Sequence, residues 1–66
     1  MSYSYIKETV AKSGKSLPCS AVNDKGENVI ISGDSNCYVT HTMQKNDWCR
    51  VNEYYPDGTI TETFER

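Results

Sequence analysis

Three cysteines and a single histidine are the residues of this chain whose types are best suited to chemistry: Cys19, Cys37, His41 and Cys49. Thiolate and imidazole groups are the preferred ligands of tetrahedral zinc. The spacing contains no Cys-x-x-Cys pair, and in the strand register predicted from the turns Cys49 points away from the other three side chains. We therefore expect no metal site, and we interpret the cysteines as reduced, small apolar side chains.

The same residues offer little for nucleophilic catalysis. Cys37 and His41 share a face of a predicted strand but lie roughly 13 Å apart at the rise of a strand, whereas a nucleophile and its base must be within hydrogen-bond reach. The carboxylates of Glu53 and Glu62 fall on opposite faces of the predicted sheet, and the four glycines form no phosphate-binding loop. We expect a protein that is not an enzyme and needs no cofactor.

Aromatic residues give the stronger functional suggestion, because the chain has five tyrosines. Tyr38 and Tyr55 on one face of a sheet can stack on unpaired bases. Trp48 and Tyr54 on the other face offer the same possibility, but with Phe64 they are also the expected core of a small sheet. An acidic chain lacks the positive surface that single-strand binders normally add, so binding of single-stranded nucleic acid is our second hypothesis.

Charge and hydropathy restrict the partners further. The chain has 66 residues, a formal net charge of −2 and a pI near 5.2, with few and scattered basic residues, which argues against binding to a nucleic-acid duplex. No apolar run approaches the length of a membrane span, and the N-terminus lacks the features of a signal peptide. We expect a cytoplasmic protein without membrane contact.

The first segment is predicted to be a short helix, about residues 3–13. Tyr3, Ile6 and Val10 recur at helical spacing, and Gly14 is a typical stop signal. A mobile arm is the alternative, because an isolated helix of this length is marginal in water unless it packs on something.

The rest of the chain predicts strands separated by turn clusters of Asn, Asp and Gly. The last hairpin is the clearest, because Pro56, Asp57 and Gly58 supply the turn chemistry and place Tyr55 opposite Thr59. Every connection is short, so consecutive strands are expected to be antiparallel neighbours. The predicted strands cover about residues 18–23, 27–32, 37–43, 48–55 and 59–65.

Turn lengths then assign side chains to the two faces of the sheet. With a bulge at Gly26 and a four-residue loop over residues 44–47, the apolar residues gather on one face that is expected to be hidden. The predicted hidden face carries Cys19, Ala21, Val29, Ile31, Cys37, Val39, His41, Met43, Trp48, Arg50, Asn52, Tyr54, Ile60, Glu62 and Phe64. The predicted solvent face carries Tyr38, Thr40, Thr42, Val51, Glu53, Tyr55, Thr59, Thr61 and Thr63.

Polar residues on the predicted hidden face need partners. In this register His41 lies opposite Arg50, and Asn52 lies opposite Glu62. Arg50 is diagonal to Glu62, so we expect an ion pair between them. Either these four polar side chains remain in contact with water, or the predicted register of one strand is wrong.

We therefore predict a single α+β domain over residues 1–66, with a short N-terminal helix packed on a five-stranded antiparallel meander that can curl into a small, partly open barrel. The function expected is that of a small non-enzymatic protein-binding module, an adaptor or inhibitor that also self-associates. The terminal strand, residues 59–65, offers a free backbone edge for such a contact. The alternative is that Glu62 and Glu65 blunt this edge, because charged side chains discourage pairing with another strand. The candidate binding residues are Tyr38, Thr40, Arg50, Glu53 and Tyr55.

Overall fold

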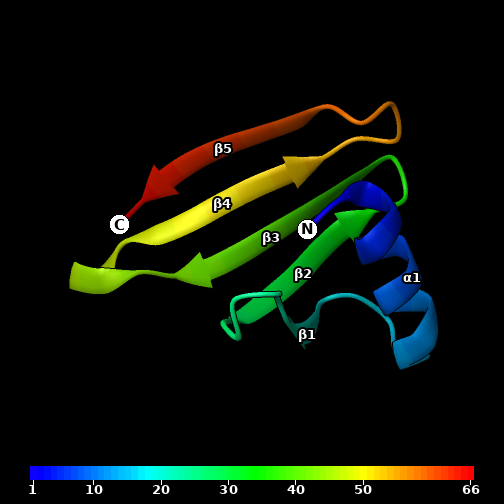
Figure 1. Ribbon diagram of the computed structural model, residues 1–66, viewed down its shortest axis with the longest axis horizontal. Helices are drawn as coiled ribbons and strands as arrows, with labels where there is room; N and C mark the ends of the chain where they lie inside the picture. Colours follow the sequence, from blue (N-terminus) through cyan, green and yellow to red (C-terminus); the bar gives the residue numbers. More distant parts are fainter.

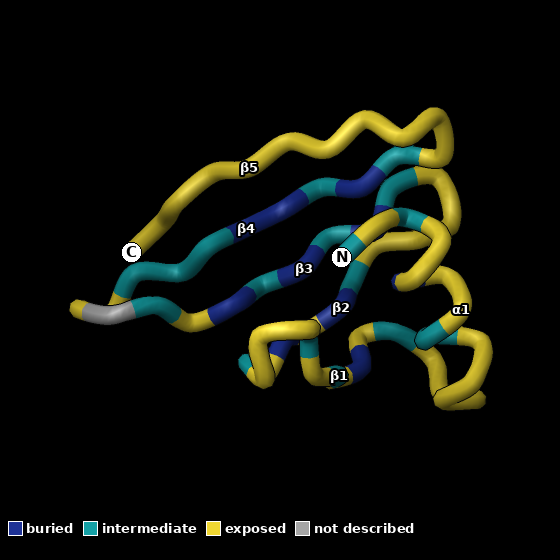
Figure 2. The backbone as a smooth tube through the Cα atoms, viewed as in Figure 1, coloured by how far each residue is buried: buried dark blue, intermediate teal, exposed yellow. Residues whose placement is uncertain are grey.

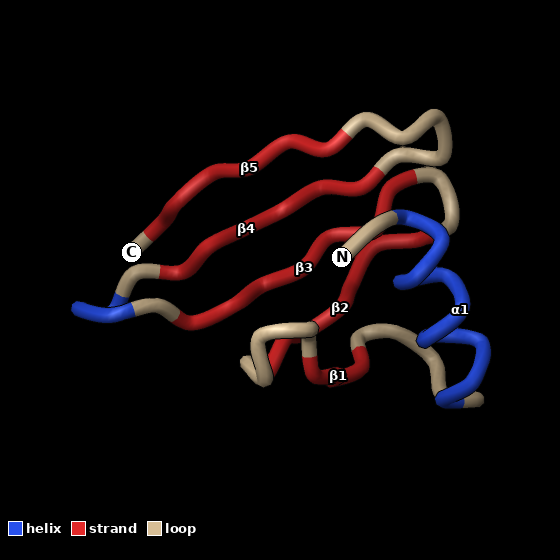
Figure 3. Tube along the Cα trace, in the orientation of Figure 1, coloured by secondary structure: helices blue, strands red, loops and turns tan.

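The fold is one N-terminal helix and one five-stranded antiparallel sheet, as predicted (Figures 1 and 3). The computed structural model describes residues 1–66 apart from the side chain of Lys45. The strands follow one another in the order β1-β2-β3-β4-β5, so β1 and β5 are the two edges. The sheet is open and does not close into a barrel. The elements are α1 (Tyr3–Ser13), β1 (Cys19–Val22), β2 (Asn28–Asp34), β3 (Cys37–Met43), the 3-10 turn η1 (Lys45–Asp47), β4 (Cys49–Tyr54) and β5 (Ile60–Glu65).

Helix α1 begins and ends where its capping residues place it. The Tyr5 amide donates to Ser2 Oγ at 3.2 Å, which satisfies one of the free N–H groups of the first turn. Gly14 ends the helix with a φ of 65°, a left-handed conformation that costs glycine little. The helix turns Ile6 inward, where this side chain is completely buried.

The core lies between α1 and one face of the sheet. Ile6 packs with apolar side chains of four strands, and the ring of Tyr3 lies 5.4 Å from that of Tyr38, centroid to centroid. Buried residues occur in each of β1 to β4, whereas every residue of β5 is exposed (Figure 2). The buried apolar cluster consists of Ile6, Cys19, Val29, Ile31, Tyr38 and Tyr54.

The first and last hairpins have the predicted registers. Cys19 pairs with Ile31 and Ala21 with Val29, on the face that α1 covers. At the other end of the sheet, the Tyr55 amide donates to the Thr59 carbonyl at 2.9 Å.

The predicted register of β3 is wrong by one residue. Met43 pairs with Cys49, and the Gln44 amide donates to the Trp48 carbonyl at 2.7 Å, so the loop between these residues is only three residues long. Asn46 and Asp47 make this short loop possible, because both adopt left-handed backbone with φ of 63°, a conformation that Asn and Asp tolerate better than most residues.

This one-residue difference exchanges the two faces of β3. Tyr38, Thr40 and Thr42 are buried on the helix side, whereas they were predicted to face solvent. The side chains predicted inside, Cys37, Val39, His41 and Met43, lie on the opposite face. His41 consequently pairs with Val51 and not with Arg50.

The predicted core at the far end of the sheet is also wrong. Ile60 and Phe64 lie on the expected face, but they are 49% and 54% exposed, because α1 lies at the β1–β2 end of the sheet and does not reach β5 (Figure 1). Trp48 is half-buried, and the guanidinium of Arg66 lies 4.8 Å from its ring centroid. The aromatic core is therefore built from Tyr38 and Tyr54.

Among the described residues, the structure contains no helix with the length and apolarity needed to cross a bilayer.

Candidate functional site

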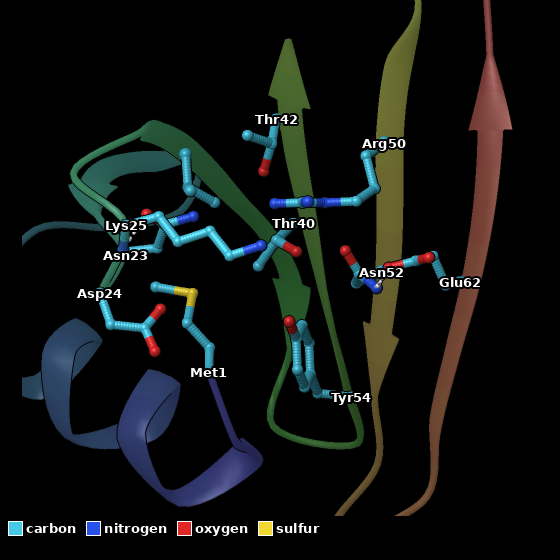
Figure 4. A pocket seen from close by; sticks show the side chains of 11 residues that line it. Met1, Asn23, Asp24, Lys25, Thr40, Thr42, Arg50, Asn52, Tyr54 and Glu62 are labelled. Atoms are coloured by element: carbon cyan, nitrogen blue, oxygen red, sulfur yellow. Dashed lines mark hydrogen bonds between the residues drawn. The ribbon is translucent and has the colours of Figure 1, made fainter. Parts of the chain in front are cut away.

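A polar pocket lies on the helix-bearing face of the sheet, beside the core (Figure 4). Its floor is formed by side chains of β3, β4 and β5, and its walls are Met1 and the turn between β1 and β2. The cavity has a volume of about 230 Å³. Polar side chains that contribute to it include Thr40, Thr42, Asn52 and Tyr54.

The turn at one wall of the pocket is organised by Asn23. Its side-chain oxygen accepts from the amides of Lys25 and Glu27, both at 2.9 Å, and its side-chain nitrogen donates to Glu27 Oε1 at 3.0 Å. Lys25 extends from this turn over the pocket (Figure 4). The Asn side chain thus holds the backbone of this turn in place and binds the Glu27 carboxylate beside it.

Arg50 connects the sheet to that turn. Its Nη2 donates to Glu27 Oε1 at 3.1 Å, and the two side chains are 19% and 34% exposed. The hydrogen bond from Asn23 and the nearby Arg50 guanidinium hold the pKa of Glu27 below its ordinary value. The ion pair predicted between Arg50 and Glu62 is not the one that forms: the partner of Arg50 is Glu27.

The pairing of Asn52 with Glu62 is confirmed. These residues are opposite one another on β4 and β5, and Asn52 Nδ2 donates to Glu62 Oε2 at 3.0 Å. Because its nitrogen is occupied, Asn52 turns its side-chain oxygen toward the interior of the pocket (Figure 4).

Three buried hydroxyl groups complete the floor of the pocket. Thr40, Thr42 and Tyr54 are 1%, 3% and 6% exposed, yet the side-chain hydrogen bonds of the described residues include none to these hydroxyls. No described polar side-chain atom is both unsatisfied and cut off from solvent. The three hydroxyls are therefore available to hydrogen-bond with water or a ligand inside the pocket.

A second cluster lies on the opposite face of the sheet, which α1 does not cover. Cys37 Sγ donates to Glu53 Oε2 at 3.9 Å, and Thr61 Oγ1 donates to Glu53 Oε1 at 3.1 Å. Hydrogen bonding with the Cys37 side chain, followed by charge repulsion from Cys37 and Glu53, raises the pKa of Tyr55 above its ordinary value.

The predicted binding residues are divided between these two faces. Thr40 and Arg50 line the polar pocket, and Tyr38 is buried in the core next to it. Glu53 and Tyr55 belong to the cluster on the uncovered face. Tyr38 and Tyr55 were predicted to share a face, and the structure separates them.

The cysteines and the histidine are also placed differently from the prediction. Cys37, His41 and Cys49 share the uncovered face, and it is Cys19 that lies on the other one, so the predicted exclusion of Cys49 is wrong. All three thiols are free. In the part of the chain that the structure describes, no three His, Cys, Asp or Glu side chains gather closely enough to hold a metal ion.

The β5 edge is the third surface that could serve binding. All its residues are exposed, and β4 is its one neighbour in the sheet. Because the Tyr55 amide bonds to the Thr59 carbonyl, the alternation of an antiparallel ladder directs the N–H and C=O groups of Ile60, Glu62 and Phe64 away from β4.

Sequence reasoning missed the pocket as a site. Asn52 and Glu62 were expected to form a polar strip on the hidden face, and this was the available signal. The other pocket residues of the sheet were missed because the predicted register of β3 was wrong by one residue, which placed Thr40 and Thr42 on the solvent face. The contribution of the turn residues Lys25 and Glu27 depends on how the first hairpin folds over the sheet, which no local pattern encodes.

Comparison with known proteins finds no matching protein-family model, no matching curated protein and no matching solved structure.

Proposed function

We propose that this chain is a small, non-enzymatic, cytoplasmic protein-binding module, an adaptor or inhibitor, that self-associates through β5. The observation that carries the proposal is the exposed, unpaired edge of β5. Edge strands of monomeric proteins are normally shortened, bulged, covered or blocked by proline. β5 is not shortened, bulged, covered or interrupted by proline; Glu62 and Glu65 are its charged residues, and it also displays the apolar side chains of Ile60 and Phe64.

The partner with the best match to this edge is a second copy of β5. Antiparallel pairing about a two-fold axis places a residue opposite itself and keeps equivalent faces together. Centring the axis on Glu62 brings two carboxylates face to face, which is unfavourable. Centring it on Thr63 pairs the whole segment 61–65 with its copy and places Glu62 opposite Phe64.

In the register centred on Thr63, both copies use their outward-facing backbone groups. Glu62 of one copy exchanges hydrogen bonds with Phe64 of the other, and Thr63 meets Thr63 at a pair without hydrogen bonds. The two open sheets then form one continuous sheet that carries both helices on the same face. The outward N–H and C=O groups of β5 then have hydrogen-bond partners, and no charged residue lies opposite a residue of like charge.

The alternative function, binding of single-stranded nucleic acid by sheet aromatics, has less support. The predicted stacking pairs were Tyr38 with Tyr55 and Trp48 with Tyr54, and one ring of each pair, Tyr38 and Tyr54, is buried in the core. Arg50, whose guanidinium could otherwise meet a phosphate group, is paired with Glu27. The geometry therefore favours a protein partner.

Cysteine scanning tests the proposed register. The Thr63→Cys variant is expected to form a disulfide-linked dimer on mild oxidation, because Cα atoms about 4.5 Å apart at such a pair lie within the range that disulfides bridge. Thr61→Cys is the matched control, since its two copies would be roughly 13 Å apart in this register. Both variants keep the three native thiols, so cross-linking through these would appear equally in each.

Sedimentation tests self-association itself. The wild-type chain is expected to show a concentration-dependent dimer, and Glu62→Pro is expected to be monomeric because proline removes an outward N–H. Glu62→Ala removes the same side chain, keeps the N–H and is expected to dimerise. A monomeric wild-type chain at every concentration, or equal cross-linking of the two cysteine variants, would overturn the proposal.

A further inference from the structure

We propose that the polar pocket binds one small, neutral polyhydroxylated molecule of the monosaccharide class. This inference goes beyond protein binding, because the pocket lies within a single protomer. The hydrogen-bonding groups, the charge balance and the volume of the pocket each restrict the ligand.

The hydrogen-bonding groups require a ligand that both donates and accepts. Thr40, Thr42 and Tyr54 each present a hydroxyl, which can do either, and Asn52 presents an acceptor oxygen (Figure 4). All four residues are more than nine-tenths buried. Neighbouring hydroxyl groups on a sugar ring match this arrangement, because each can accept one hydrogen bond and donate another.

The charge balance argues for a neutral ligand. The charge of Arg50 is neutralised by Glu27 at 3.1 Å, and the carboxylate of Glu62 stands at the pocket beside Asn52. An anion would be repelled by Glu62 and Asp24, and a cation would meet Arg50 and Lys25. The remaining donors of Arg50 are still available for hydrogen bonds to a ligand oxygen.

The volume limits the ligand to one small ring. The cavity of about 230 Å³ is smaller than the range of roughly 300–1,000 Å³ typical of drug-sized ligands. Val29 adds an apolar wall against which the C–H groups of a sugar ring can pack.

Amide NMR titration of the full chain tests this proposal. The probes are D-glucose, D-galactose, D-mannose and D-ribose, with inorganic phosphate and glycine as charged and zwitterionic comparisons at matched ionic strength. We expect saturable shifts for at least one sugar, confined to the amides of residues 40–42, 50–54 and 62 and the turn 23–25. Phosphate and glycine are expected to cause no saturable change there.

Variants that remove single hydroxyls make the test specific. Tyr54→Phe and Thr40→Val keep the side-chain shapes, and each is expected to weaken sugar binding about three- to tenfold, the effect of one lost hydrogen bond. Thr9→Val makes the same change on α1, outside the pocket, and is expected to bind like the wild-type chain. If Thr40→Val does not fold, Tyr54→Phe alone decides.

Three results would overturn the proposal. The first is the absence of saturable shifts with every sugar. The second is saturable binding of phosphate or glycine at the pocket amides in preference to a sugar. The third is sugar binding that Tyr54→Phe leaves unchanged, because the sugar would then sit elsewhere. None of these results bears on self-association through β5, so the two proposals fail separately.

Discussion

Glu27 shows how a partly exposed residue can couple two distant segments. Its carboxylate receives hydrogen bonds from Asn23 in its own turn and from Arg50 on β4. These contacts hold the pKa of Glu27 below the ordinary value of 4.5. The first hairpin is thus fastened to the middle of the sheet by a carboxylate that must stay ionised.

The lowered pKa of Glu27 predicts a pH-dependent stability. A depressed folded-state pKa stabilises the fold above the unfolded pKa, and this contribution is lost as pH falls through the folded value. We expect the urea midpoint of the wild-type chain to fall as pH drops below about 4.5. Glu27→Gln should lower the midpoint at neutral pH and show a flatter decline in acid. Equal slopes for the two proteins would contradict this role for Glu27.

Gly33 is the glycine that the fold can least replace. It pairs with Tyr38 at the end of the β2–β3 hairpin with φ of 87°, and a Cβ built there would collide with the Cys37 carbonyl oxygen. Gly26 also has positive φ, at 79°, but nothing lies within 4 Å of its Cβ position. Comparing substitutions at Gly26 and Gly33 therefore separates the energetic cost of backbone strain from the cost of a steric collision.

Alanine substitution at these two glycines should therefore have unequal effects. Gly26→Ala should destabilise the fold by about 1 kcal/mol, the cost of a left-handed residue with a side chain. Gly33→Ala should cost about 3 kcal/mol or more, because strain and collision add. Urea unfolding measures both, and similar costs at the two sites would show that the Cys37 carbonyl moves aside easily.

At the scale of the element, α1 is stabilised mainly by one side chain. Ile6 is completely buried against side chains of β1, β2, β3 and β4, whereas its neighbour Tyr5 is about half exposed. A short helix depends on such packing more than on its intrinsic propensity. The attachment of α1 to the sheet should therefore depend strongly on Ile6.

Replacing Ile6 should unfold most of the domain. Ile6→Ala is expected to cost about 2–5 kcal/mol, comparable with the roughly 3–5 kcal/mol that so small a core supplies. Tyr5→Ala on the same helix is expected to cost less than about 1 kcal/mol. Far-ultraviolet circular dichroism with urea unfolding distinguishes the two variants. A stable Ile6→Ala protein that keeps its helix would show that the sheet does not depend on this contact.

At the scale of the whole molecule, the class of fold could be predicted from local signals. Helical spacing and the glycine stop placed α1, and the Pro56-Asp57-Gly58 turn fixed the pairing of β4 with β5. The β3–β4 turn could not be read in the same way. Asn46 and Asp47 shorten it without glycine or proline, and a change of one residue in a turn reverses a whole strand.

The location of the core could not be predicted from strand patterns, because it depends on where α1 lies. The pattern of β5, with Ile60 and Phe64 on one face, is typical of a half-buried strand. The helix is too short to cover five strands, so these side chains stay exposed, and the buried apolar cluster forms nearer α1, around Ile31, Tyr38 and Tyr54. The pocket arises at the same boundary, where buried hydroxyls of β3 meet the polar residues of β4.

The alternating backbone of β5 has a consequence for solvent exchange of its amides. The N–H groups of Thr61, Thr63 and Glu65 point toward β4, and those of Ile60, Glu62 and Phe64 point outward. In an isolated protomer, deuterium should therefore replace every second amide proton along this strand much faster than its neighbours. Once an edge partner docks, the fast sites should become slow and the period of two should disappear.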